Sequence, residues 1–451
     1  MHCLCALSFE KVILCIFLIT RIPSLLEKDM EKFCGRGSKS CMLIGKSVKV
    51  DRISELPEEL LIHILSFLPP KFACTTSILS KRWKPLCQFL TVFRFDDKSV
   101  KNEEEFILFN MFINKVMLSK DRQQSIKVFH LRCHSALSLI NHDEWVEAAK
   151  RRGIEDLQLS MFQFVMVRKM YLSCYNSMMD KFITISPNGV FSCRTLVILK
   201  LKRLCVAGNI LSIDLPSLKI LHLKGVYLQN SEDLKGLISA SLVLEDLYIL
   251  VGYKESASIP LTRVGLGPYH VLFKAIYYNV QFLRLEARIP NEKIISYFKG
   301  STVFRNLIHI ELVFYHLYGW DDVVNVLQHC PNLHIFSIDR VTKIPSIVSG
   351  EWFRKWEYTM TIDGKSFTNW KCPNSVPKCI SYHLRLCTVT YDGNMDSLRF
   401  ATYILQKAPL LQVMTVKITK LTNQIYDWVF LDKLCSSPKI SPNCEISIVQ
   451  I

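Results

Sequence analysis

Apolar residues recur along the middle of this chain in one short pattern. An aliphatic or aromatic residue is followed three and five positions later by two more, which gives the template L-x-x-L-x-L. Alternation at the end of this template is typical of a strand that buries one face. The template begins at residues 154, 196, 218, 244, 280, 307 and 333. We therefore expect seven short strands that point alternate side chains into a shared core.

The intervals between these start positions indicate a repeat. They are 42, 22, 26, 36, 27 and 26 residues, obtained by subtracting successive positions. Four of these six intervals fall within the roughly 20 to 29 residues of a leucine-rich repeat, and 42 is about two repeats. Since one such unit cannot bury its apolar edge alone, the pattern predicts a stacked solenoid with a strand-lined concave face. A conventional α/β domain with leucine-rich strands is the alternative.

A dense apolar segment before the repeats predicts short helices. Pro57 suits a first helical turn, and the two prolines after Leu68 are expected to end that helix. Ser80 can cap a further helix, in which Pro85 would be the fifth residue and would kink or shorten it. The first helix has more apolar positions than one core-facing side needs: Leu60, Leu61, Ile64, Leu65, Phe67 and Leu68. The surplus is consistent either with a buried helix or with an exposed docking surface.

The last third of the chain predicts a strand, a helix and a second strand. Polar and apolar residues alternate over 383–391, and helical spacing follows over 396–407 until Pro409 stops it. The next segment fits the repeat template again at Leu411, Met414 and Val416. This unit is expected to close the solenoid and shield its last apolar face.

Composition indicates a folded chain in a reducing compartment. Hydrophobic residues make up 49% of 451 residues, which is enough for a sizeable core and more than one domain. The 17 cysteines form no C-x-x-C pair, so we expect reduced thiols and a location in the cytoplasm or nucleus. The net charge of +16 comes without a long basic run, and we expect no nucleic-acid partner.

An apolar run near the N-terminus raises the question of a membrane span or a secretory signal. Residues 12–19 are apolar, but the run is too short to cross a bilayer, which takes about 20 residues. It also lacks the flanks of a secretory signal, so we expect no membrane association. We predict that residues 1–50 are a disordered extension. The alternative for residues 1–29 is that translation begins at Met30 and leaves them out.

Catalytic and cofactor motifs are not found in the sequence. It contains neither G-x-S-x-G nor a Walker-type glycine loop. His130 and His134 would share one face of a strand, but two histidines without a third ligand do not make a metal site. We predict no catalytic residue, no cofactor and no metal.

The helical segment resembles the F-box of plant proteins. The resemblance covers Asp51 to Trp83 and is densest in "ELPEELLIHILSFLP" and "SILSKRW". It implies a three-helix module that docks on a Skp-type adaptor and through it on a cullin ubiquitin ligase. It implies that Leu79 and Trp83 brace the third helix, and that the following residues face the adaptor: Leu56, Pro57, Leu60, Leu61, Ile64 and Leu68.

The C-terminal third is similar to the FBD module of many plant F-box proteins. The similarity rests on "VPKC", the helix ending in "YILQKAP", and "SPNCEISI", with Asp392 and Asp396 as the remaining acidic residues before and in the helix. The expected fold class is mixed α/β: a small three-helix N-terminal F-box, an irregular leucine-rich-repeat solenoid, and a capping strand-helix-strand FBD module. The expected segments are 51–97, 98–350 and 351–451.

These resemblances imply a substrate-recognition subunit of a Skp-cullin-F-box ubiquitin ligase, in which the solenoid binds an unknown protein substrate. The chemistry would then belong to other subunits. Two other functions stay open. One is a leucine-rich-repeat interaction protein that acts outside ubiquitination, and the other is an enzyme, which requires a closed sheet with a deep polar pocket.

Overall fold

The structure of the chain is a computed structural model. It describes residues 56–78, 81–118, 124–134, 142–161, 183–229, 231–253, 279–287, 303–314, 320–340, 370–391, 395–418, 432 and 434–450. The predicted N-terminal extension, Leu79 and the Ser80 cap lie outside these residues. Residues Pro57–Ile451 belong to one compact unit.

Short helices open the described part of the chain. They are α3 (Glu58–Ser66), α4 (Pro70–Thr75), the 3-10 helix η1 (Thr76–Ile78), α5 (Trp83–Leu86) and the 3-10 helix η2 (Cys87–Phe89). Pro57, predicted in the first helical turn, is instead the N-cap of α3, which ends at Ser66 rather than Leu68. Pro70 occupies the first turn of α4, where its missing N–H costs no hydrogen bond. The two prolines therefore start a helix that the sequence did not predict.

Pro85 does not have the position that the sequence predicts. The last short helix, α5, begins at Trp83 with Arg82 as its N-cap, so Pro85 is the third helical residue and not the fifth. Backbone N–H groups in the first turn have no acceptor inside the helix. Pro85 therefore removes no hydrogen bond there. The helix is nonetheless short, because after Leu86 the chain continues as the 3-10 helix η2.

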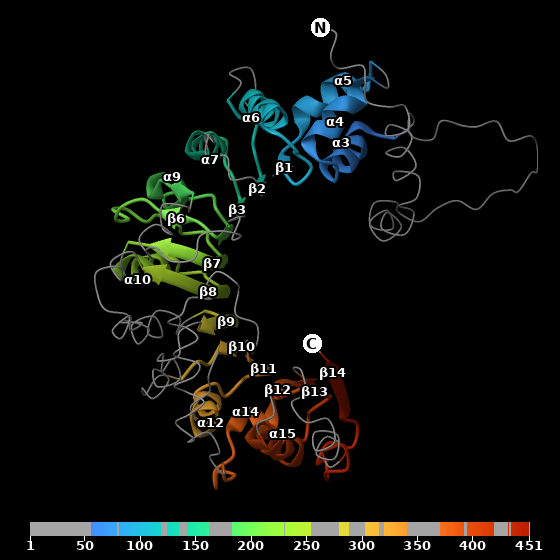
Figure 1. Cartoon of the computed structure of the whole chain (residues 1–451), viewed down its shortest axis with the longest axis vertical. Helices are drawn as coiled ribbons and strands as arrows, with labels where there is room; N and C mark the ends of the chain where they lie inside the picture. The colour runs from blue at the N-terminus through green and yellow to red at the C-terminus, as the bar shows by residue number, and fades with distance from the viewer. Residues whose placement is uncertain are drawn as a thin grey trace, which may run out of the picture. The chain divides into compact units, whose positions relative to one another are not determined.

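One parallel sheet follows the chain from the helical module to the C-terminal end (Figure 1). Its strand order is β1-β2-β3-β5-β7-β8-β9-β10-β11-β12-β13-β14, so each strand pairs with the next ladder strand along the sequence. The first six are β1 (Val92–Asp96), β2 (Val128–Cys133), β3 (Asp156–Met161), β5 (Ile198–Lys202), β7 (Ile220–Leu228) and β8 (Asp246–Tyr253). The others are β9 (Phe282–Ala287), β10 (His309–Phe314), β11 (Ile335–Arg340), β12 (Leu386–Tyr391), β13 (Val413–Ile418) and β14 (Glu445–Gln450).

The seven strands predicted from the template are confirmed, since each begins two residues after a template start. Their register aligns equivalent template positions, so Leu157 pairs with Leu199 and Leu199 with Leu221. These leucines are almost completely buried, and the residues between them are only partly covered. The stacking of the units as a leucine-rich-repeat solenoid stays a prediction.

The longest template interval does not hold an extra ladder strand. Strand β3 pairs directly with β5, although 42 residues separate their template starts. The short strand β4 (Thr184–Ile185) lies in this interval and pairs with β6 (Cys205–Val206) beside the main ladder. The 42-residue interval, although about two repeat lengths long, therefore places no additional strand between β3 and β5.

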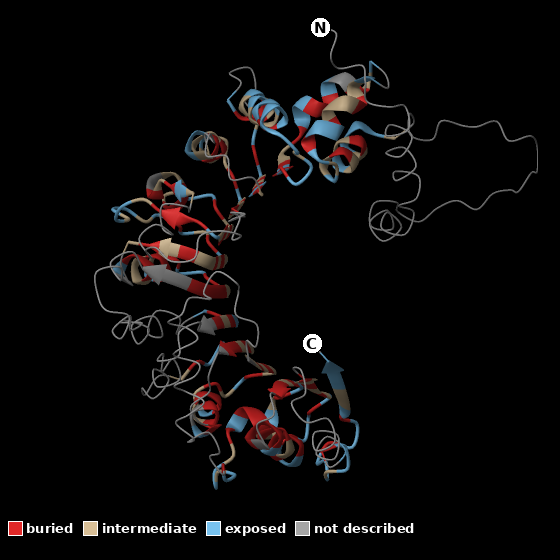
Figure 2. Ribbon diagram, in the orientation of Figure 1, coloured by how far each residue is buried: buried red, intermediate tan, exposed pale blue. Residues whose placement is uncertain are grey.

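Helices connect several of the strands and supply the other half of the core (Figure 1). They are α6 (Glu103–Met117), α7 (His142–Arg151), α9 (Pro187–Phe191), α10 (Ser231–Ala240), α12 (Trp320–Gln328), α14 (Lys378–Tyr382) and α15 (Met395–Lys407). Figure 2 shows buried residues along the strands and in α12 and α15. Among the residues that the structure describes, no helix has the length and apolar character to span a bilayer.

The predicted strand-helix-strand unit at the C-terminus is confirmed as β12, α15 and β13. It does not end the sheet, because β14 pairs with the outer edge of β13. The residues of β14 are mostly exposed, and Val449 keeps 40% of its surface accessible. The strand order runs from β1 to β14, which are the outer strands of the sheet.

Candidate partner-binding surfaces

The N-terminal helical module has its own small core. Leu61, Leu65, Leu86 and Leu90 are at most 2% exposed, and Trp83 from α5 is 5% exposed. The core is supported by contacts of α3 with α4, α5 and η2. The Cys87 thiol lies 2.9 Å from the carbonyl oxygen of Ala73, which ties η2 to α4. Trp83 lies in this core, and its role as a brace stays a prediction.

Polar and backbone contacts join this module to the sheet. Helix α4 contacts β1, and the Arg94 Nη1 donates a hydrogen bond to the carbonyl oxygen of Ser66 at 3.1 Å. The module is therefore packed on the first strand of the sheet.

The predicted adaptor-facing residues divide into two groups. Leu56, Leu60, Ile64 and Leu68 are half-buried and Pro57 is exposed, so each keeps accessible surface. Leu61 keeps none and belongs to the core of the module. The apolar spacing of α3 did not separate these two groups in the sequence. Such spacing shows which residues are apolar, but not which side of the helix its neighbours bury.

Four further apolar side chains on the module are exposed and were not among the predicted site residues. They are Phe67, Phe72, Ile78 and Phe89, with exposed fractions of 66%, 36%, 82% and 47%. The ring of Phe67 packs edge-on against His63, with centroids 4.9 Å apart. Large exposed apolar side chains gathered on one small module are typical of an interaction surface. The sequence analysis had already counted Phe67 among the excess apolar residues of the first predicted helix.

The open face of the sheet carries mostly polar residues in ordered rows, although Tyr248 and Leu250 on it are buried. Alternate strand residues point to this face, and the register places His130, Gln158, Lys200, His222 and Tyr248 in one row. The next row holds Arg132, Ser160, Lys202, Lys224 and Leu250. Neighbouring strands are about 4.8 Å apart, so residues within a row can contact a common ligand.

The histidines on this face pair with carboxylates of the next strand. His130 Nε2 lies 2.9 Å from Asp156 Oδ2, and His222 Nε2 lies 3.0 Å from Asp246 Oδ2. His130 and His134 do not converge, since His134 lies near Asp96 and Asp97 instead. The structure thus gives the two histidines separate partners.

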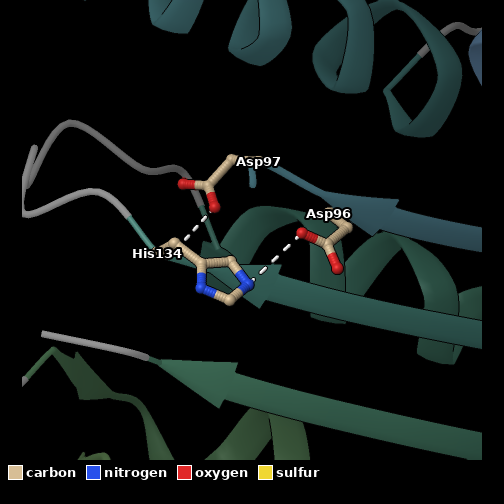
Figure 3. A group of neighbouring side chains, drawn as sticks. All are labelled: Asp96, Asp97 and His134. Carbon is tan, nitrogen blue, oxygen red and sulfur yellow. Dashed lines mark hydrogen bonds and ion pairs between the residues drawn. The ribbon is translucent and has the colours of Figure 1, made fainter. Parts of the chain in front are cut away.

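Asp96, Asp97 and His134 form one group of side chains that could hold a metal ion (Figure 3). Their candidate ligand atoms lie within 4.8 Å of one another. The buried Asp97 carboxylate accepts a hydrogen bond from the backbone N–H of His134, and Asp96 lies 3.3 Å from the His134 ring. These contacts tie the end of β1 to the end of β2, which gives the group a structural role without an ion.

Cysteines of the described segments contribute to the core. No disulfide joins them, and eight are buried: Cys87, Cys133, Cys193, Cys205, Cys330, Cys379, Cys387 and Cys444. Burial raises the pKa of the Cys379 thiol to about 12. A buried thiol with a raised pKa is unreactive and packs as a small apolar side chain.

Aromatic side chains fix the C-terminal strands and helices to the preceding unit. The rings of Trp320 and Phe400 stack with centroids 4.4 Å apart, and Trp370 packs against Phe400 and Tyr403. The buried Asp396 carboxylate accepts hydrogen bonds from the Trp370 backbone N–H and from Arg399. One of the two predicted acidic residues therefore holds this cluster, and Asp392 lies outside the described residues.

A hollow of about 540 Å³ lies beside α14. Arg305, Gln328, Asn332, Ser375 and Lys378 are among the residues that line it. Gln328 Nε2 and Ser375 Oγ approach to 3.3 Å. The lining has no carboxylate, histidine or cysteine, so it offers neither a metal site nor a general base of those types.

Comparisons with known proteins agree with this division of the chain. The F-box domain family model matches residues 53–95, and the FBD family model matches residues 371–416. The first match covers the helical module and β1, and the second covers α14, β12, α15 and most of β13.

Full-length relatives come from Arabidopsis thaliana. The FBD-associated F-box protein At4g10400 is 27% identical over 88% of this chain and 100% of its own length. The F-box protein At4g09920 is 30% identical over 73% of this chain and 94% of its own length. The putative F-box/FBD/LRR-repeat protein At5g62970 is 27% identical over 82% of this chain and 93% of its own length. With an F-box on the helical module and an FBD on the last strands, the chain belongs to the plant F-box proteins that carry a C-terminal FBD.

Proposed function

We propose that this chain is a substrate-recognition subunit of a Skp-cullin-F-box ubiquitin ligase. The observation that carries the proposal is the F-box match over a module that keeps an apolar surface. The accessible apolar side chains of the module include Leu56, Leu60, Ile64, Phe67, Leu68 and Ile78. They would bind a Skp-type adaptor, which would connect the chain to a cullin.

The half-buried and exposed side chains supply enough apolar area for such a complex. Complete burial of a leucine, isoleucine or phenylalanine side chain contributes roughly 1.5 to 3 kcal/mol. Several such side chains can support association after the loss of translational and rotational freedom is subtracted. Leu61, Leu65 and Trp83 would support this surface from behind, without contacting the adaptor themselves.

In this proposal the chain has the three segments expected from its sequence. They are an F-box over 51–97, repeats over 98–350 and an FBD module over 351–451. Strands in chain order and in matched register support the stacking of the repeats as a leucine-rich-repeat solenoid. The open strand face would bind the target protein, and the chain would contribute proximity rather than catalysis. We place this function in the cytoplasm or nucleus.

Co-purification with a Skp-type adaptor tests the proposal. The double variant Leu60→Asp with Ile64→Asp should lose the adaptor, because two charges would be buried at the interface. The matched control is Leu108→Asp with Met111→Asp on α6, where the parent side chains are 65% and 61% exposed. The control should keep the adaptor. Failure of the parent chain to bind the adaptor would favour an interaction protein that acts outside ubiquitination.

A further inference from the structure

The hollow beside α14 is built from three segments that are distant in the sequence. Its lining residues come from 303–305, 328–332 and 375–378. The first two segments precede β10 and β11, and the third leads into α14 within the residues that the FBD model matches. A ligand in this hollow would therefore contact both the FBD and the units before it.

Hydrogen bonds between these segments hold the walls of the hollow together. Asn332 Nδ2 donates to the carbonyl oxygen of Arg305 at 2.8 Å, which ties the first segment to the second. Gln328 Nε2 donates to Ser375 Oγ at 3.3 Å, which ties the second segment to the third. The walls are therefore in place before a ligand arrives, and this lowers the cost of ordering them on binding.

Two cationic side chains line the hollow without a compensating carboxylate. Arg305 and Lys378 are exposed, and the described lining residues include no aspartate or glutamate. Within the described part of the chain, neither side chain forms an ion pair. A concave surface lined by charge of one sign raises the local concentration of ligands of the other sign. The hollow therefore favours an anion.

We propose that this hollow binds a small phosphorylated molecule whose phosphate contacts Arg305 and Lys378. A phosphate monoester carries a charge of about −1.5 to −2 at pH 7 and three strong acceptor oxygens. The arginine can meet two of these oxygens with parallel hydrogen bonds, and the lysine can meet the third. The Ser375 hydroxyl accepts from Gln328 and can still donate its own hydrogen to the phosphate.

The rest of the lining fits an apolar body of modest size. Val303, Pro331 and Val376 are half-buried and Pro377 is buried, so they offer apolar surface beside the two cations. The volume of about 540 Å³ lies within the roughly 300 to 1,000 Å³ of small-molecule sites. A ring attached to the phosphate would therefore gain contacts that free phosphate lacks.

Other ligands fit this hollow less well. A metal ion needs carboxylate, imidazole or thiolate ligands, which none of the described lining residues supplies. Single-stranded nucleic acid needs an aromatic ring on which bases can stack, and no such ring is among these residues. A dicarboxylate divides its charge between two groups, so Arg305 and Lys378 would not both meet a doubly charged group.

Ligand-observed NMR on the full chain tests this proposal. The probe is phenyl phosphate, and the competitors are inorganic phosphate, phthalate and a three-residue phosphoserine peptide. We expect phenyl phosphate to bind more tightly than each competitor. Its binding should weaken below about pH 6, where the phosphate takes up a proton. The double variant Arg305→Gln with Lys378→Gln should weaken binding by at least about tenfold.

The matched control removes an arginine and a lysine that do not line the hollow, with Arg385→Gln and Lys371→Gln at exposed positions. It should bind phenyl phosphate like the parent. Both double variants should melt with the parent, because all four side chains are exposed.

Three results would overturn the proposal. They are no binding of phenyl phosphate, an equal loss of binding in the two double variants, and equal or tighter binding of any competitor. Adaptor capture by the same preparations tests the proposed function separately, since neither proposal depends on the other.

Discussion

The indole Nε1 of Trp370 donates a hydrogen bond to Asp321 Oδ1 at 3.0 Å. The indole belongs to the segment that enters the FBD, and the carboxylate belongs to α12 of the preceding unit. Trp370 is 7% exposed and contacts Phe400 and Tyr403 of α15. One side chain thus holds the FBD to the unit before it.

We expect Trp370→Ala to lower the free energy of unfolding by about 3 to 5 kcal/mol, as is usual when a buried tryptophan is truncated. Trp370→Phe keeps part of the packing and loses the hydrogen bond, so it should cost less. Urea denaturation of the full chain measures both changes. An equal loss in the two variants would mean that the hydrogen bond, and not the packing, holds this contact.

Leu60 and Leu61 are neighbours in sequence with different expected roles. Leu61→Ala removes a side chain that is 0% exposed and should destabilise the helical module by about 2 to 5 kcal/mol. Leu60→Ala should change stability less and weaken adaptor binding more. Thermal melts and titration with the adaptor separate the two effects. Equal destabilisation by the two variants would contradict the assignment of Leu61 to the core and Leu60 to the surface.

Replacement of Pro85 should not improve adaptor binding. The residue is exposed and lies in the first turn of α5, where proline is tolerated. We therefore expect Pro85→Ala to bind the adaptor within about twofold of the parent and to change the free energy of unfolding by at most about 0.5 kcal/mol. A large gain in affinity would show that the proline distorts the adaptor-facing surface.

We expect ionised Glu311 to stabilise the folded chain in a pH-dependent way. A hydrogen bond from His309 and the charge of Arg284 lower its pKa from 4.5 to about 2, although partial burial opposes this change. Since the folded chain binds the proton less tightly than the unfolded chain, the contribution is complete above about pH 4.5 and declines toward pH 2. Glu311→Gln should therefore melt below the parent at pH 7, with a difference that narrows as pH falls. A difference that is constant from pH 7 to pH 2.5 would contradict this assignment.

Gly225 and Gly189 form a matched pair for testing the backbone conformation at the bulge in β7. Gly225 has a φ of +65°, and an added Cβ would meet only the Arg203 side chain at 3.8 Å. Alanine there should cost about 1 to 2 kcal/mol through the backbone alone. Gly189, in α9, has no positive φ, and alanine there should be neutral or slightly stabilising. Urea denaturation compares the two, and equal effects would mean that the backbone at Gly225 is not restrained.

The sequence predicted the strands of the repeats because burial imposes their alternation locally. Leu221 and Leu223 are both 0% exposed, with the half-buried His222 between them, and this pattern needs no knowledge of distant residues. Strands β1 and β2 have equivalent buried positions at Phe93, Phe95 and Phe129, where phenylalanine replaces leucine. The template admits aromatic residues, as at Phe336, so β1 and β2 fit it too, although they were not among the seven predicted strands.

Burial and contacts that depend on residues far apart in the sequence could not be predicted. The surplus leucines of α3 could not be divided into core and surface until the position of Trp83 was known. The alignment of Lys202 with Lys224 could not be predicted either, since the two residues are 22 positions apart and become neighbours only through the register of β5 and β7. Scattered lysines in a sequence look alike whether or not a sheet brings them together.

The order of the strands has a consequence for how the chain can change. Because each ladder strand pairs with the next ladder strand in sequence, most interactions in the sheet are between nearest neighbours. Cooperativity between distant units is then weak, and a substitution in one unit is felt mainly by the units on either side. Residues on the strand face can therefore change while the helical module, several units away in the ladder, keeps its fold.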